Sequence, residues 1–173
     1  TAARALYEAA AAQGNAGAQL RLGELYRDGE IPVPDGGRAP AGRRDTAPHL
    51  LRAFDWFSRA AQQGEPAAQC ELGQMYAQGM GTKQDFAQAA HWYREAAAKG
   101  HAKAQFNLGF LHAHGQGVIQ DDGQAYQWYR LSELGGYALA KQSAALAARK
   151  LSEAAKELAD WRIDSVVNGR KEA

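Results

Sequence analysis

The chain has 173 residues, and its 20 Lys and Arg against 19 Asp and Glu give a formal net charge of +1. This length fits one domain whose core needs neither disulfides nor a metal, and the single cysteine, Cys70, excludes an internal disulfide framework. The balanced charge argues against binding to nucleic acid or to an anionic membrane surface, and no apolar run approaches the about 20 residues of a membrane-spanning helix.

The first helical pattern of the chain contains the pair Leu22-Gly23. The residues before it include Leu6, Tyr7 and Gly14.

Residues 30–48 interrupt this helical pattern. The segment contains four prolines and three glycines, which do not suit a helix interior, so it is predicted to be an exposed loop. Arg38, Arg43 and Arg44 make the loop locally basic. Long loops in compact domains are often functional or disordered, and a binding role for this loop is one interpretation that stays open.

An internal repeat organises the chain. Tryptophans and glycines recur at intervals of 36 residues, as Trp56, Trp92 and Trp128 and as Gly64, Gly100 and Gly136. The pair Leu72-Gly73 recurs 36 residues later as Leu108-Gly109, whereas Leu22-Gly23 lies 50 residues before it. The first repeat thus carries 14 additional residues, which the loop at 30–48 accommodates.

Each repeat is predicted to form two helices. In the second repeat, the first helix carries an apolar stripe at helical spacing that consists of Ala68, Leu72, Met75 and Tyr76. Gly79 and Gly81 then break the helix, Asp85 is placed to cap the next helix, and Gly100 is placed to end it.

The first helix of each repeat also contains a glycine in one register, Gly23, Gly73 or Gly109. Glycine inside a helix costs about 1 kcal/mol relative to alanine, so something must offset it. We expect close approach of the second helix, whose aromatic pairs are Trp56-Phe57, Trp92-Tyr93 and Trp128-Tyr129. These aromatic residues are accordingly predicted to lie in the core.

The second repeat resembles the Sel1-like repeats, which are relatives of the tetratricopeptide repeats. The matching residues are Ala68, Gln69, Leu72, Gly73, Tyr76, Gly79, Gly81, Asp85, Ala89, Trp92, Tyr93, Ala96, Ala97 and Gly100. The resemblance implies an all-α fold, a right-handed α-solenoid of stacked antiparallel helix pairs with a C-terminal helical cap. In the third repeat His112 replaces the tyrosine and Ser132-Glu133 replace two alanines, which predicts a looser or more polar fit to the C-terminal segment.

The predicted organisation is one repeat domain over residues 1–173. It consists of the second helix of a partial repeat at 1–14, a repeat at 15–64 with the inserted loop 30–48, repeats at 65–100 and 101–136, and capping helices at 137–173. In the last helix, Ser152 is placed as the N-cap. We expect Leu158, Trp161 and Val166 to face inward there.

By analogy with tetratricopeptide repeats, exposed positions of the first helices line a concave groove. The expected groove residues are Leu20, Glu24, Arg27, Asp28, Cys70, Gln74, Gln78, Lys103, Phe106, Phe110, His114, Gln142, Leu146 and Arg149. Phe106 and Phe110 lie four residues apart on one helix face, so they are expected to anchor a partner segment. The alternative is that these two rings pack against the cap or a neighbouring helix. Cys70 is likewise expected either to line the groove or to fill space.

No reactive constellation is visible in the sequence. His112 and His114 lie two residues apart and would point to different faces of a helix, and no Glu or Cys completes a ligand set, so no metal site is predicted. His112 is predicted to pack in the tyrosine register. The Gly79 and Gly115 segments resemble phosphate-binding loops only superficially, because they recur as inter-helix turns. No catalytic residue and no cofactor is predicted.

The function implied by the resemblance is a non-enzymatic scaffold that binds a protein or peptide segment in its groove, in a bacterial envelope or regulatory assembly. Neither nucleic-acid binding nor direct membrane insertion is expected. Two alternatives stay open. One is a cell-wall-ligand binder or weak hydrolase of the Sel1-like type, although such proteins are typically cysteine-rich, and the other is a structural spacer of a larger protein.

Overall fold

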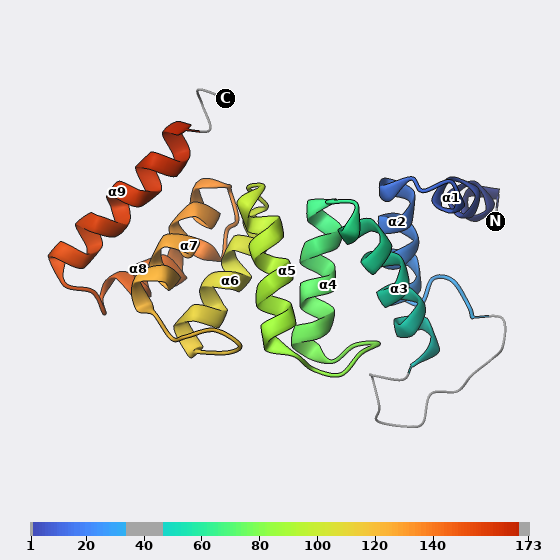
Figure 1. Cartoon of the computed structure of the whole chain (residues 1–173), viewed down its shortest axis with the longest axis horizontal. Coiled ribbons are helices and arrows are strands. Elements are labelled where there is room, and N and C mark those ends of the chain that lie inside the picture. The colour runs from blue at the N-terminus through green and yellow to red at the C-terminus, as the bar shows by residue number, and fades with distance from the viewer. Residues whose placement is uncertain (1, 34–46, 170–173) are drawn as a thin grey trace. The chain divides into compact units, whose positions relative to one another are not determined.

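The computed structural model describes residues 2–33 and 47–169, and within these ranges it contains nine helices and no strand (Figure 1). The helices are α1 (Ala2–Ala12), α2 (Ala16–Arg27), α3 (Pro48–Gln62), α4 (Pro66–Gln78), α5 (Phe86–Ala98), α6 (Ala102–His114), α7 (Asp122–Leu134), α8 (Ala140–Ala148) and α9 (Glu153–Gly169). Most of the predicted loop at 30–48, including its three arginines, lies outside the described residues.

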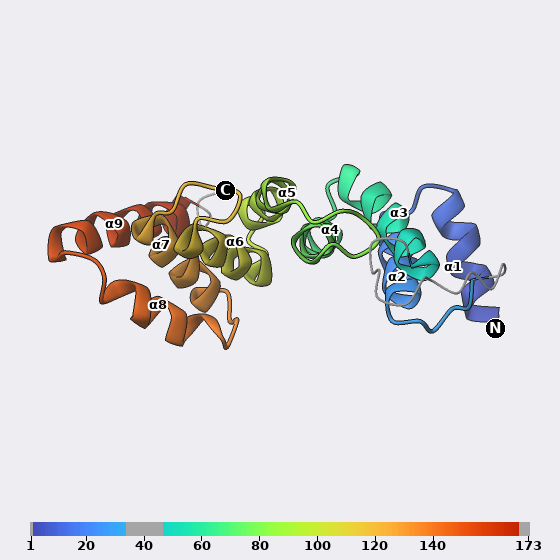
Figure 2. The same cartoon turned by 90° about the horizontal axis from the view of Figure 1, so that it is seen from below.

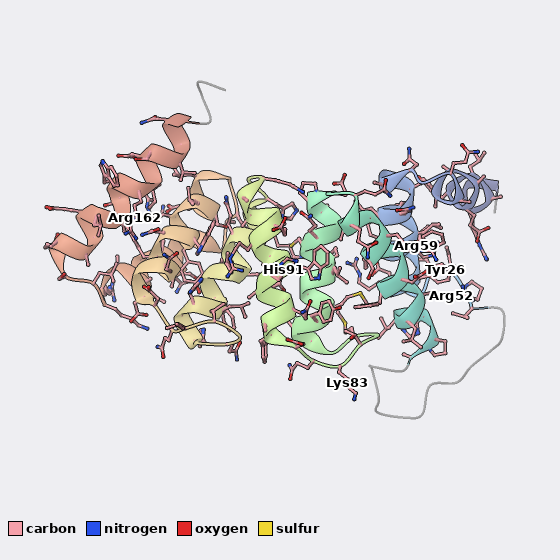
Figure 3. All side chains as sticks on the ribbon, viewed as in Figure 1. Tyr26, Arg52, Arg59, Lys83, His91 and Arg162 are labelled. Atoms are coloured by element: carbon pink, nitrogen blue, oxygen red, sulfur yellow. The ribbon has the colours of Figure 1, made fainter. Side chains whose placement is uncertain are left out.

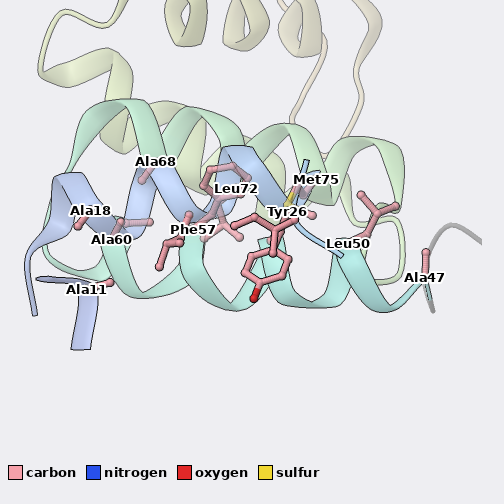
Figure 4. Packing of buried hydrophobic residues seen from close by; sticks show 14 residues of the cluster. Ala11, Ala18, Tyr26, Ala47, Leu50, Phe57, Ala60, Ala68, Leu72 and Met75 are labelled. Carbon is pink, nitrogen blue, oxygen red and sulfur yellow. The ribbon is translucent and has the colours of Figure 1, made fainter. Parts of the chain in front are cut away.

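The chain divides into two compact units, Thr1–Ala96 and Ala97–Ala173. In the N-terminal unit, α2 packs against α1 and α3, and α3 packs against α4 (Figures 1 and 2). Phe57, Leu22 and Leu72 are almost fully buried between these helices together with Met75, and Figure 4 shows Phe57, Leu72 and Met75 in that core. The prediction of one domain over the whole chain is not decided by this division.

The helix boundaries follow the predicted start and stop residues. The carboxylates of Asp85 and Asp121 each accept a hydrogen bond at 2.9 Å from the backbone amide three residues later, which satisfies an otherwise unpaired donor at the helix start. Gly79 and Gly115 end α4 and α6 in the left-handed conformation, both with φ of +64°. Glycine adopts this conformation without steric cost.

The mid-helix glycines meet the second aromatic residue of each predicted pair. A Cβ built on Gly23 would lie 2.5 Å from the Phe57 ring, and one on Gly73 would lie 2.7 Å from the Tyr93 ring. On Gly109 the corresponding distance to the Tyr129 ring is 3.0 Å. The expected close approach is confirmed, because these distances are shorter than ordinary contacts of about 3.5–4.0 Å. The three repeat tryptophans are only half-buried.

A buried glutamine in each repeat ties its first helix to the end of the helix before it. Each side-chain amide donates to the carbonyl eight residues earlier, Gln19 to Ala11 at 3.1 Å, Gln69 to Ala61 at 3.2 Å and Gln105 to Ala97 at 3.2 Å. These carbonyls stand at helix C-termini, where each also accepts a hydrogen bond from the backbone amide three residues later, so the glutamine supplies a second donor. The glutamine of the repeat pattern therefore has a structural role that the sequence alone did not reveal.

In the C-terminal unit, α7 packs against α6, α8 and α9 (Figures 1 and 2). Within the third repeat, the buried hydroxyl of Ser132 donates to the carbonyl of Ala102 at 2.7 Å. Ser152 caps α9 as predicted, since its hydroxyl accepts a hydrogen bond from the amide of Ala155 at 3.3 Å.

The prediction of which α9 residues face inward is wrong. Ala159 and Ile163 are the buried residues of this helix, whereas Leu158, Trp161 and Val166 are 50%, 66% and 40% exposed. Successive helix residues differ by about 100°, so once Ala159 and Ile163 face α7, the residue midway between them points to the opposite side.

Candidate functional site

A cleft of about 390 Å³ opens in the C-terminal unit between α6, α7 and α8. Its lining consists of Phe110, Ala113, His114, Asp122, Tyr129, Ser143, Leu146, Ala147 and Lys150. Two large apolar side chains in this lining are exposed, Phe110 at 42% and Leu146 at 53%. Tyr129 and Ala147 are buried, so they form its inner part.

Helical spacing explains why these residues meet. On α6, Phe110 and His114 lie one turn apart, and on α8, Ser143 and Ala147 do so as well. Lys150 lies two residues after the end of the short helix α8. Since α7 packs against both α6 and α8, the cleft-lining faces of these two helices converge above it.

The polar groups of the cleft hold its walls in place. The His114 ring lies against the Phe110 ring with centroids 4.1 Å apart, and its Nδ1 is hydrogen-bonded to the Phe110 carbonyl at 2.9 Å. Lys150 Nζ pairs with Asp122 Oδ1 at 3.0 Å. This ion pair is exposed, so it adds little stability, but it links the end of α8 to the start of α7.

Tyr129 differs from the neighbouring Tyr126 in its hydrogen bonding. The Tyr126 hydroxyl donates to Asp160 on α9 at 2.7 Å, whereas no residue that the structure describes bonds the Tyr129 hydroxyl. Burial raises the pKa of Tyr129 to about 12. The phenol therefore stays neutral at physiological pH and remains a hydrogen-bond donor.

Three of the predicted groove residues come together in the cleft, namely Phe110, His114 and Leu146. Phe106 does not join them, because its ring packs against Tyr129 at 5.3 Å and Tyr137 at 5.1 Å. For Phe106, the alternative of packing against neighbouring elements is therefore the correct one. Of the other predicted groove residues in this unit, Gln142 and Arg149 are exposed beside the cleft-lining face of α8 and at its end, and Lys103 is half-buried on α6.

The predicted groove residues of the N-terminal unit serve its own packing. Arg27 pairs with Asp28 and with Glu71, so it connects α2 to α4. The remaining positions are Leu20, which packs against the core, Glu24, which pairs with Arg21 at 2.9 Å, Gln74, which is half-buried, and Gln78, which is exposed.

Cys70 is fully buried, so it lines no open surface. Packing on two sides explains this, because α3 lies against α4 and the Tyr93 ring of α5 reaches Gly73 of the same helix. The buried face of α4 is therefore wider than one stripe and includes Gln69 and Cys70.

A second hollow, of about 610 Å³, lies in the N-terminal unit. It is lined by Arg4, Tyr7, Arg21, Leu25, Glu30, Ile31 and Pro32. Both arginines already have partners, Arg4 with Glu8 at 2.8 Å and Arg21 with Glu24 at 2.9 Å. The charge of each guanidinium is already offset by a neighbouring carboxylate, so this hollow is the weaker candidate site.

Metal-ligating side chains do not gather in groups of three or more within the ranges 2–33 and 47–169. His112 Nδ1 is hydrogen-bonded to the carbonyl of Ile119 at 3.3 Å, and the side chain is half-buried, while His114 lies against Phe110. Among the helices described here, none has the length and apolar character needed to cross a membrane.

Comparison with known proteins identifies relatives of the whole repeat array. A family model for the Sel1 repeat matches residues 1–15, 16–39, 50–65, 66–101 and 102–137, which is more than half of the chain. The matches that begin at 16, 66 and 102 each start one residue after the predicted repeat. No curated protein matches the chain.

Several solved structures are similar, and two of them show the extent of the match. One is a protective antigen present in uropathogenic Escherichia coli strains that displays an SLR fold, with 28% identity and a TM-score of 0.69 over 96% of this chain and 40% of that chain. The other is a Sel1 repeat protein from Oxalobacter formigenes, with 34% identity and a TM-score of 0.64 over 78% of this chain and 50% of that chain. The chain thus spans half or less of each structure, and the predicted all-α repeat fold is confirmed.

Proposed function

Because the chain belongs to the Sel1 repeat family, we propose that it binds a segment of a partner protein in the cleft between α6, α7 and α8. Sel1 repeat proteins generally act as scaffolds for protein interactions, and their fold is typically non-catalytic. The proposal assigns this general role to one surface of the chain.

One observation carries the proposal. Phe110 and Leu146 extend from α6 and α8 into the lining of the same cleft and stay 42% and 53% exposed. Exposed apolar side chains around a concave site, with polar groups at its edge, are typical of ligand-binding pockets. Full burial of such a side chain contributes about 1.5–3 kcal/mol, and since Phe110 and Leu146 are already about half buried, covering the rest of each would contribute about half of that.

A double variant, Phe110→Glu with Leu146→Glu, tests the proposal. The full chain and the variant are used to capture proteins from cells of the source organism, and circular dichroism checks that both are equally helical. We expect the variant to lose a partner that the unchanged chain retains, because two buried carboxylates would oppose docking. Phe106 is not a suitable target, because its ring packs inside the unit.

The matched control is the double variant Ile119→Glu with Leu158→Glu. It makes the same chemical change at two exposed apolar residues outside the cleft lining, 89% and 50% exposed, and it should retain the partner. If the cleft variant also retains the partner, the cleft is not the binding surface.

The setting that we propose is an assembly of the bacterial envelope. The family resemblance supports it, and so does the similarity to a protein described as a protective antigen. Fractionation of the source bacterium tests this part separately. Recovery of the chain in envelope or periplasmic fractions is the expected result, and recovery in the cytosol alone would contradict it.

A further inference from the structure

The cleft contains a buried hydrogen-bond donor that has no partner among the described residues. Tyr129 is 5% exposed, it belongs to the cleft lining, and no described residue bonds its hydroxyl. Buried phenols usually find a partner. The Tyr129 hydroxyl is not among the fully enclosed unpaired atoms of the described chain, so it is not sealed off, and Tyr129 is one of the residues that line the cleft. A ligand oxygen could accept its hydrogen bond there.

The charges around the cleft favour one kind of ligand. The segment from α8 to Lys150 carries Lys141, Arg149 and Lys150 and no acidic residue. On α7, Asp122 is paired with Lys150, and the carboxylate of Asp121 caps the helix. No carboxylate of the described chain pairs with Arg149, which is exposed at the end of α8. Three cations, Lys141, Arg149 and Lys150, against two carboxylates, Asp121 and Asp122, leave a formal charge of +1 at this edge.

We propose that the cleft recognises an acidic peptide segment that inserts one apolar side chain between Phe110 and Leu146 and presents an oxygen acceptor to the Tyr129 hydroxyl. Arg149 faces the acidic group of the segment. This inference rests on the proposed function, because it names the chemistry of the segment that the cleft binds. The acceptor is either a backbone carbonyl or a carboxylate, since both accept from a neutral phenol.

The test uses a phage-displayed library of random peptides, panned against the full chain. Peptides that also bind the Phe110→Glu/Leu146→Glu variant are removed in each round. We expect the remaining sequences to be enriched in a large apolar residue followed or preceded by Asp or Glu. A selected peptide is then synthesised, and its affinity is measured by calorimetry for the chain and for point variants.

Two variants test the two polar contacts. Tyr129→Phe removes only the hydroxyl and should weaken the peptide about tenfold, as expected for one lost hydrogen bond of about 1.4 kcal/mol. Arg149→Glu reverses the charge at the edge of the cleft and should weaken binding severalfold, with the difference shrinking as salt is added. Arg162→Glu, on the exposed side of α9 (Figure 3), makes the same charge change outside the cleft and should have no effect.

The outcomes separate this inference from the proposed function. If the enriched peptides are basic or uncharged, the inference is overturned while the cleft remains the binding site. The same holds if the selected peptide binds the Tyr129→Phe and Arg149→Glu variants as tightly as it binds the unchanged chain. If no peptide is enriched over the cleft variant, both the inference and the cleft as a peptide site are refuted.

Discussion

Gly23 should contribute to the stability of the fold, because a side chain at this position would clash with the Phe57 ring. In Gly23→Ala, the new methyl group would lie 2.5, 2.6 and 3.0 Å from three atoms of the Phe57 ring, and Phe57 is fully buried and cannot turn away. Overpacking of this kind costs about 1–3 kcal/mol, and the better helix propensity of alanine returns about 0.5–1 kcal/mol. The free energy of unfolding should therefore fall by about 1–2 kcal/mol.

Gly17→Ala on the same helix is the matched control. Its methyl group would meet only Asn15 Oδ1 at 3.4 Å, an ordinary contact, so the variant should gain about 0.5 kcal/mol from propensity alone. In Gly109→Ala the methyl group would lie 3.0 Å from the Tyr129 ring. Its change in the free energy of unfolding should therefore lie between those of Gly23→Ala and Gly17→Ala.

The assay is urea unfolding followed by circular dichroism, from which the free energy of unfolding is extrapolated for each variant. Gly23→Ala and Gly17→Ala should shift the free energy in opposite directions. A Gly23→Ala chain that is as stable as the unchanged chain, or more so, would refute the argument that the Leu-Gly pair exists to admit the aromatic ring.

Three further predictions concern stability. Tyr126→Phe should lower the free energy of unfolding by about 1.5 kcal/mol in urea titrations, because its hydroxyl donates to a carboxylate on α9, whereas Tyr129→Phe should not lower it. Both tyrosines have pKa values of about 12 in the folded chain against about 10 when unfolded. The free energy of unfolding should therefore be unaffected by their ionisation below pH 10 and should decrease as the pH rises from 10 to 12. In the double phenylalanine variant this decrease should be smaller. Gly81→Ala should lower the free energy of unfolding more than Gly29→Ala does in the same titration. Both glycines have positive φ, +65° and +74°, but only at Gly81 would a Cβ clash with the Leu50 carbonyl oxygen.

Most of the fold could be predicted because its signals are local and repeated. Asp85 and Asp121 cap helices, and Gly79 and Gly115 end them, through contacts within a few residues of the chain. A spacing of 36 residues in several residue types then fixes the repeat. Backbone capping depends on residue type and neighbouring positions alone, so the sequence suffices to place these elements.

The candidate site could be predicted only in part. Helical spacing correctly placed Phe110 and His114 on one face of α6, but it placed Phe106 there as well, and Phe106 packs against Tyr129 and Tyr137. Tyr129 was assigned to the core, and its access to the cleft gave no sequence signal. A pattern of four-residue spacing says which residues share a face, but not how much of that face a neighbouring helix covers.

The sequence by itself determined the helices, their caps, the repeat and the family, because each of these depends on residue types at fixed spacing along the chain. Only the tertiary structure decided which side chains stay exposed. Cys70 is enclosed because α4 packs on two sides, and Trp161 is exposed because α9 meets α7 through Ala159 and Ile163. Burial depends on what packs from elsewhere in the chain, and an apolar residue on a helix is equally compatible with either outcome until that neighbour is in place.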